Sequence, residues 1–234
     1  MKKRTKSKMR AKPRRKSRPK IKKLFLPNRC LIIECDVDRL GEQNLNFGQE
    51  LDKIINSFKF ESKIIAIKSA QEAPTQFSNV FNETKQFDIV VLVGHGSPEG
   101  MRFSSDSFIN YSNISKWISQ FRPKILFMVT CKGGHSIATE ALFQGIKSVK
   151  EIYGSPVNSS KAALGIVKLI IPLLFLFGKL NKEILLTVKW INFLVTDGVL
   201  LTHTRSDFLK NKPIKSLLDD LFPLVVQLKR ALFK

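Results

Sequence analysis

The sequence is poor in cysteine, and this scarcity narrows the classes of protein to which the chain can belong. It contains only Cys30, Cys35 and Cys131, an odd number that does not build a disulfide framework. No secretory signal precedes them, because the apolar stretch Leu24–Leu26 ends at Pro27. We therefore expect a reduced, cytoplasmic protein. Cys30 and Cys35 fall in one apolar segment, where free cysteine behaves as a small buried hydrophobe.

Two common catalytic motifs are also missing. The chain has no G-x-x-x-x-G-K-[ST], which excludes a P-loop, and neither Ser97 nor Ser155 lies in a G-x-S-x-G, which disfavours α/β-hydrolase chemistry. A zinc site built from His95, Cys131 and His135 would have no evident fourth ligand. The sequence therefore predicts neither a metal nor a cofactor.

Acidic residues are absent from the first 33 positions, and this absence explains most of the charge of the chain. The formal net charge is +21, and residues 1–23 contain 14 Lys or Arg, so the remainder carries only +7. Residues 1–27 have too few apolar side chains to offset ordering entropy, and we predict a disordered polybasic tail. Residues 2–23 suit anionic lipid headgroups, nucleic acid phosphates or simple solubilisation. The lack of aromatic residues there disfavours base stacking.

No apolar run reaches the roughly 20 uninterrupted residues that a bilayer-spanning helix requires. The two longest, 162–178 and 184–201, are each broken by a lysine and by a proline or an aspartate. We expect helices that cover the core, with a hairpin inserted in or lying on a membrane as the alternative. A last amphipathic helix is expected at 214–232, where Pro213 suits its first turn.

What the sequence does contain is an alternation of apolar strand-like runs with segments of helical periodicity. This alternation predicts an α/β fold with a mainly parallel sheet and helices on both faces. The α/β core is expected at 28–160, and a mostly helical C-terminal part at 161–234 packs on it. Strands are expected at 29–35, 64–67, 88–93, 124–130 and 151–155, a hairpin at 101–110, and helices at 47–58, 77–81, 114–121 and 136–147.

Two of the predicted strands end in the same way. FDIVVLVGHG (87–96) ends beside His95, and KILFMVTCKGG (124–134) ends beside Cys131. Continuous apolar runs suit parallel strands buried on both faces, and ligands of open α/β sheets bind beyond the carboxyl ends of the strands. If the two strands are neighbours, an imidazole and a thiol meet at one edge as candidate base and nucleophile.

These residue types describe acyl transfer, most simply peptide hydrolysis. Cys131 lies at a strand-to-helix turn, where a following helix favours thiolate, and Gly133 and Gly134 permit a tight turn. His95 can act as base and then as acid toward a leaving amine. The backbone N–H groups of Gly96 and Cys131 are the predicted donors to the developing oxyanion.

Residues 29–160 resemble the caspase-like cysteine peptidases, a clan that includes caspases, metacaspases, gingipains, separase and CHAT-domain proteins. Cys131-Lys132-Gly133 resembles the Cys-Arg-Gly of caspases, although Val129 and Thr130 replace the usual Gln and Ala. HGSPEGMRFSSDSFINYSNISKWI resembles the CHAT pattern of His-Gly, hairpin and helix, and the His-to-Cys separation is 36 residues. The resemblance implies a His95–Cys131 dyad that acts on a protein or peptide.

Each candidate also has a structural interpretation. His95 can simply end a strand, Cys131 can be a buried core thiol, and His135 can begin a helix. His203 lies in a polar, loop-like stretch, for which we predict a surface position. The alternative function is therefore a catalytically inactive α/β binding or adaptor module that associates with membrane or nucleic acid.

Overall fold

The computed structural model describes residues 27–35, 47–104, 107–155, 161–177 and 201–210. All of the predicted tail except Pro27, the helix expected at 214–232 and nearly all of the apolar segment 184–201 lie outside these ranges. Predictions for those parts of the chain stay predictions.

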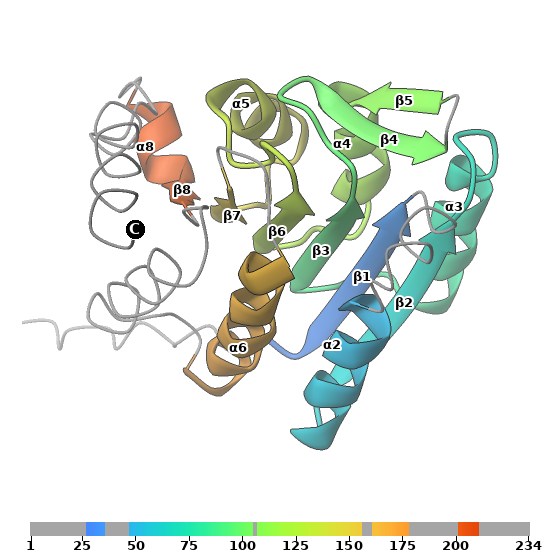
Figure 1. Ribbon diagram of the computed structural model, residues 1–234, viewed down its shortest axis with the longest axis vertical. Helices are drawn as coiled ribbons and strands as arrows, with labels where there is room; N and C mark the ends of the chain where they lie inside the picture. Colours follow the sequence, from blue (N-terminus) through green and yellow to red (C-terminus); the bar gives the residue numbers. More distant parts are fainter. Residues whose placement is uncertain (1–26, 36–46, 105–106, 156–160, 178–200, 211–234) are drawn as a thin grey trace, which may run out of the picture.

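A mainly parallel sheet forms the centre of the described structure (Figure 1). Its spatial order is β2-β1-β3-β6-β7-β8, in which the first five strands are parallel and β8 is antiparallel to β7. The predicted α/β class with a mainly parallel sheet is confirmed. The strands are β1 (Arg29–Cys35), β2 (Glu61–Ile67), β3 (Ile89–Gly94), β6 (Ile125–Thr130), β7 (Glu151–Gly154) and β8 (Leu201–Thr204).

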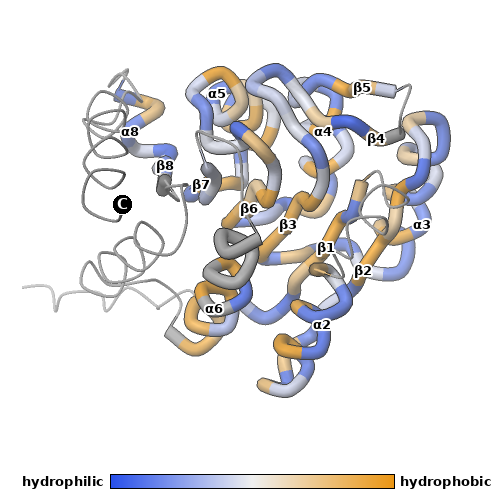
Figure 2. Tube along the Cα trace, viewed as in Figure 1, coloured by the Kyte–Doolittle hydropathy of each residue, from blue (hydrophilic) through white to orange (hydrophobic). Residues whose placement is uncertain are grey.

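Helices cover both faces of this sheet and create two apolar cores. On one face lie α3 (Ala73–Glu83), α4 (Tyr111–Ser119) and α5 (Ser136–Gly145), and on the other lie α2 (Phe47–Ser57) and α6 (Lys161–Phe177). Alternate residues of β1 serve the two sides, because Leu31 and Ile33 join the first core, and Cys30 and Ile32 join the second. Burial on both faces explains why the central strand β3 is a continuous apolar run, which Figure 2 shows as an orange segment.

A small antiparallel hairpin stands beside the main sheet between β3 and α4. It consists of β4 (Gly100–Ser104) and β5 (Ser107–Asn110), and β4 contacts β1 and β3. Its inner face is apolar, since Met101 and Phe103 are fully buried. Arg102 pairs with Phe108 across the hairpin on the opposite face. The hairpin predicted at 101–110 is confirmed.

The last described strand, β8, was not predicted, and it corrects the prediction for His203. His203 is buried, with 7% of its surface exposed, and its Nε2 lies 2.9 Å from the carbonyl oxygen of Gly134. The predicted surface position is therefore wrong. The segment Leu201–Thr204 is short and half polar, so its periodicity gave no strand signal. Pairing with β7 converts it into the edge of the sheet, and α8 (Arg205–Leu209) follows directly.

The first of the two long apolar segments forms α6. Val167, Ile170, Ile171, Leu174 and Phe175 of this helix pack in the second core. The prediction that 162–178 forms a core-covering helix agrees with this packing. Within the described ranges, no helix combines the length and apolar content needed to cross a bilayer.

Candidate functional site

The two predicted strand ends are neighbours in space. Gly94 pairs with Thr130 as the last register pair of β3 and β6, and His95 and Cys131 follow these two residues directly. A Cβ atom placed on Gly96 would lie 2.9 Å from the carbonyl oxygen of Cys131, so the two strand-end loops are in backbone contact. The structure therefore places His95 and Cys131 at the same edge of the sheet, as expected. Their catalytic roles remain a prediction.

Glycine is required where these two loops approach each other. Thr130 is buried beneath them, and its Oγ1 would lie 2.9 Å from a Cβ on Gly96 and 2.5 Å from a Cβ on Gly133. Both distances are shorter than real Cβ contacts, so a side chain at either glycine would push the loops apart. The two glycines thus set how closely the His95 loop and the Cys131 loop approach each other.

The turn that carries Cys131 has an uncommon backbone conformation. Lys132 has φ 56°, in the left-handed region that costs a non-glycine residue energy, and such residues cluster at functional sites. Cys131 is half-buried, whereas Cys30 and Cys35 have no exposed surface. The predicted packing role of those two residues is confirmed, and Cys131 is the one cysteine of the chain that a solute can reach.

His135 ends the turn as the N-cap of α5. Its side chain accepts a hydrogen bond from the Ile137 N–H, with 3.4 Å between Nδ1 and the nitrogen. This is the helix-start position that the sequence predicted for it. His203 supports the same turn from β8 through its contact with the Gly134 carbonyl.

The loop after β3 continues into the hairpin as an antiparallel pair. The Arg102 N–H donates to the His95 carbonyl at 2.8 Å, and the Ser97 N–H donates to the Gly100 carbonyl at 2.9 Å. Gly96 and Met101 face each other between these two bonds. In an antiparallel pair, residues at such a position direct their N–H groups away from the partner strand. The Gly96 N–H therefore points away from β4.

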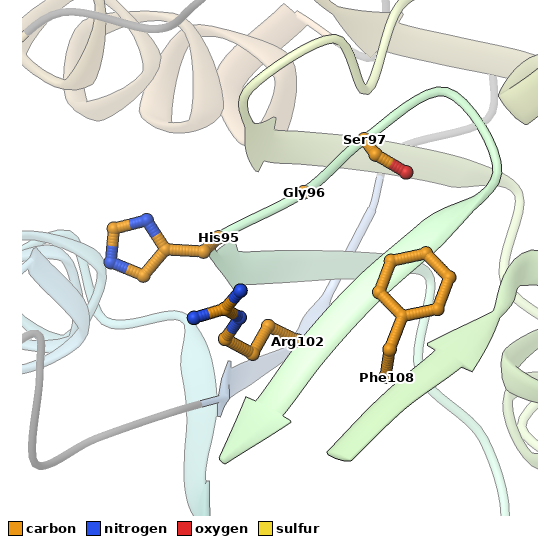
Figure 3. Close-up of a pocket in the computed structure, with 5 residues that line it drawn as sticks. All are labelled: His95, Gly96, Ser97, Arg102 and Phe108. Atoms are coloured by element: carbon orange, nitrogen blue, oxygen red, sulfur yellow. The ribbon is translucent and has the colours of Figure 1, made fainter. Parts of the chain in front are cut away.

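A cavity of about 220 Å³ lies over this loop (Figure 3). His95, Gly96, Ser97, Arg102 and Phe108 line it, and Cys131 is not among its lining residues. Figure 3 shows the His95 imidazole and the Arg102 guanidinium extending in the same direction, whereas the Phe108 ring stands on the neighbouring strand of the hairpin, on the other side of the Arg102 backbone. Phe108 is 54% exposed, which is unusual for a large aromatic side chain.

The Glu99 carboxylate interacts with polar and charged groups around this loop. The Ser97 hydroxyl donates to the Glu99 carboxylate at 2.7 Å, and this bond is the main cause of the lowered pKa of Glu99. A further backbone hydrogen bond and electrostatic interactions with His135 and Lys132 also lower this pKa. The side chain is fully exposed, so Glu99 is a solvated partner of the Cys131 turn.

Two buried residues at this edge were missed by sequence reasoning. Tyr111 is fully buried at the start of α4, and its hydroxyl faces Thr130 beneath the two loops. Burial raises the pKa of the Tyr111 phenol, and proximity to Cys35 and Cys131 adds to the rise. In the sequence, Tyr111 falls between the predicted hairpin and the predicted helix, and nothing there indicates that it is buried.

The second missed residue is Glu34, near the end of β1. Its Oε1 accepts a hydrogen bond from the Gly48 N–H at 2.7 Å, at the N-terminus of α2. Burial raises the pKa of the Glu34 carboxyl, and the bond from Gly48 opposes this rise. A Cβ on Gly48 would collide with the carboxylate, so glycine is needed at that position. A lone glutamate in an apolar run, with a glycine 14 residues later, is too weak a signal to reveal this contact.

Among the residues that the structure describes, no group of three or more His, Cys, Asp or Glu side chains is arranged to hold a metal ion. No protein-family model matches this chain, and no curated protein matches it in sequence. The chemistry of the site therefore has to be inferred from its geometry.

Proposed function

We propose that this protein is a caspase-like cysteine endopeptidase that uses a His95–Cys131 dyad. The observation that carries the proposal is the Gly94–Thr130 register pair, which brings the half-buried thiol of Cys131 and the half-buried imidazole of His95 to neighbouring strand ends. Nucleophilic catalysis requires a reachable thiol beside a proton acceptor. Cys30 and Cys35 are sealed in the two cores and do not meet this requirement.

The reaction has two stages. The Cys131 thiol gives its proton to His95 and its sulfur bonds to the scissile carbonyl carbon. The tetrahedral intermediate then breaks its C–N bond, and His95 returns the proton to the departing amine, which leaves a thioester on Cys131. In the second stage, His95 takes a proton from water, the resulting hydroxide attacks the thioester, and the carboxylic acid product leaves as the thiol is restored.

Backbone donors stabilise the negative oxygen of the tetrahedral intermediate in this scheme. The Gly96 N–H is directed away from β4, and the Gly96 backbone lies against that of Cys131. The N–H groups of Gly96 and Cys131 are the proposed donors to the oxyanion. A side chain at Gly96 would separate the loops and misalign both donors.

Replacement of Cys131 by alanine tests the assignment. We expect Cys131→Ala to lower kcat/KM on a quenched peptide library by about a thousandfold or more, because the nucleophile is gone. Thermal unfolding should change little, since the side chain is half-buried. Cys35→Ala is the matched control, because it also removes one thiol near this edge, and it should keep its activity at temperatures where it remains folded.

Full activity of Cys131→Ala would contradict the proposed nucleophile. If the wild-type protein cleaves no member of the library and its Cys131 is alkylated no faster than a model thiol at neutral pH, the inactive binding module becomes the better interpretation. In either case residues 2–23 are the proposed contact with a polyanionic surface.

A further inference from the structure

The cavity beside His95 is placed on one particular side of the proposed dyad. In the sheet, β3 lies between β1 and β6. Cys131 follows β6, whereas the hairpin that carries Arg102 and Phe108 contacts β1 and β3. The loop of His95 and Gly96, which follows β3, therefore lies between the hairpin and the Cys131 turn, since Gly96 touches the Cys131 backbone and the loop pairs with β4. Both loop residues line the cavity (Figure 3), whereas Cys131 does not.

This position decides which part of a substrate can enter. The sulfur of Cys131 bonds to the acyl part of the substrate, and His95 delivers a proton to the amine that leaves. A cavity on the far side of His95 adjoins the residue whose nitrogen is the leaving amine. Its volume of about 220 Å³ is below the roughly 300–1,000 Å³ of pockets that hold drug-sized ligands, which suits a single side chain or chain end.

The side chains that line the cavity favour a negatively charged ligand. Among the described residues that line it, Arg102 and His95 are the basic side chains, and none is Asp or Glu. Within the described ranges, no ion pair is formed by the Arg102 guanidinium. A guanidinium pairs best with a carboxylate, through two parallel hydrogen bonds. The exposed ring of Phe108, directly across the hairpin from Arg102, offers an apolar wall for the methylene groups of such a residue.

We propose that this cavity is the leaving-group subsite and that Arg102 selects a carboxylate on the residue immediately after the scissile bond. The carboxylate comes from an acidic side chain or from a free chain end, since both present the same group. The proposal rests on the endopeptidase function for its catalytic meaning. The binding of a carboxylate next to His95 does not depend on turnover.

Matched peptides test the selection. Peptides with Glu, Gln or Lys after the scissile bond share all other residues, and a further pair ends at that residue with a free carboxylate or an amide. We expect the wild-type protein to cleave the Glu peptide about tenfold faster than the Gln peptide. Arg102→Gln should remove this preference, and Arg102→Glu should shift it toward Lys. Lys116→Gln removes an equal charge from an exposed site on α4 and should keep the preference.

Equal rates within both pairs, Glu against Gln and free carboxylate against amide, or an intact preference in Arg102→Gln, would overturn the proposal. A faster rate on the free carboxylate than on the amide, without a Glu preference, assigns the site to chain ends. If no peptide is cleaved, NMR signals of the His95 ring in Cys131→Ala decide. The carboxylate site is supported, although the endopeptidase has failed, if Glu-Ala amide shifts these signals, Gln-Ala amide does not, and Arg102→Gln abolishes the shift. The absence of any shift with Glu-Ala amide refutes the site.

Discussion

Single residues at the carboxyl edge of the sheet determine how its loops are held together. Gly96 and Gly133 bring two loops onto the buried Thr130, and Gly48 lets the Glu34 carboxylate reach the first turn of α2. In each case the glycine is needed for a close approach that any Cβ would prevent. Substitution at these positions therefore moves whole loops and does not change one contact alone.

Glu34 provides a prediction about pH at the residue scale. Its pKa is raised by burial, so the folded state holds the proton to higher pH than the unfolded chain does. The unfolded chain releases this proton near pH 4.3, and the folded protein releases it at a higher pH. Glu34 therefore contributes fully to the free energy of unfolding below pH 4.3, and this contribution is lost as the pH rises through the pKa of the folded state. Glu34→Gln should therefore gain stability relative to the wild type as the pH rises from about 4 to 8.

Urea denaturation of both proteins across this pH range measures the difference. The exposed Glu140→Gln serves as the control and should show a difference from wild type that does not vary with pH. A Glu34→Gln stability difference that is flat with pH, or that falls as the pH rises, would show that the carboxyl is not held protonated by burial.

The residues of the site were not equally visible in the sequence. His95, Gly96 and Cys131 stood out because each follows an unbroken apolar run, and the ends of parallel strands meet at one edge. Arg102 and Phe108 carried no such signal, since an alternating hairpin does not reveal which of its faces borders a cavity. Tyr111 and Glu34 depend on contacts with distant residues, which only packing creates.

At the scale of elements, the short helix α8 binds the end of α5 through Arg205. The Arg205 guanidinium, at the start of α8, donates to the carbonyls of Val149 at 2.5 Å, Phe143 at 2.9 Å and Ile146 at 2.6 Å. The same group lies 5.1 Å from the centre of the Phe143 ring. It thus supplies a donor to the Phe143 carbonyl in the last turn of α5 and ties the helix to two carbonyls of the segment that follows it.

Arg205→Ala should lower the free energy of unfolding by about 1–3 kcal/mol, because several charge-assisted hydrogen bonds are lost. Arg205→Lys should recover only part of this, since an ammonium lacks the planar fork that reaches three carbonyls. Urea denaturation measures both variants, with the exposed Lys210→Ala as the control for loss of charge. An unchanged midpoint in Arg205→Ala would show that these bonds contribute nothing to stability.

Elements were predicted well where their periodicity was long and uniform. The strands β1, β3 and β6 and the helices α2, α4 and α5 lie close to the expected ranges, because burial of a stripe or of two faces leaves a repeating pattern. The strand β8 was not predicted, because it has only four residues and forms by pairing with β7. Such a short segment has no periodic pattern of its own. The packing of α6 on the second core also became visible only in three dimensions.

The whole molecule has a strongly uneven charge distribution. Removal of residues 1–23 lowers the formal net charge from +21 to +7. We expect this truncation to weaken binding to anionic vesicles or to duplex DNA at least tenfold, and to leave cleavage of short peptides unchanged. Binding of the full chain should weaken as salt rises from about 50 mM to about 200 mM. Neutral vesicles are the control, and equal binding with and without the segment would refute a role for its charge.

The sequence by itself determined the α/β class, the parallel central strands and the concentration of positive charge at one end, because hydrophobic periodicity and charge are properties of local segments. It also determined that a histidine and a cysteine follow two such strands. The tertiary structure alone decided that these strands are neighbours, that β8 closes the edge and buries His203, and that Arg102 and Phe108 stand beside His95. Such contacts join residues far apart in the chain, and their free energy depends on shape and distance, which no local pattern records.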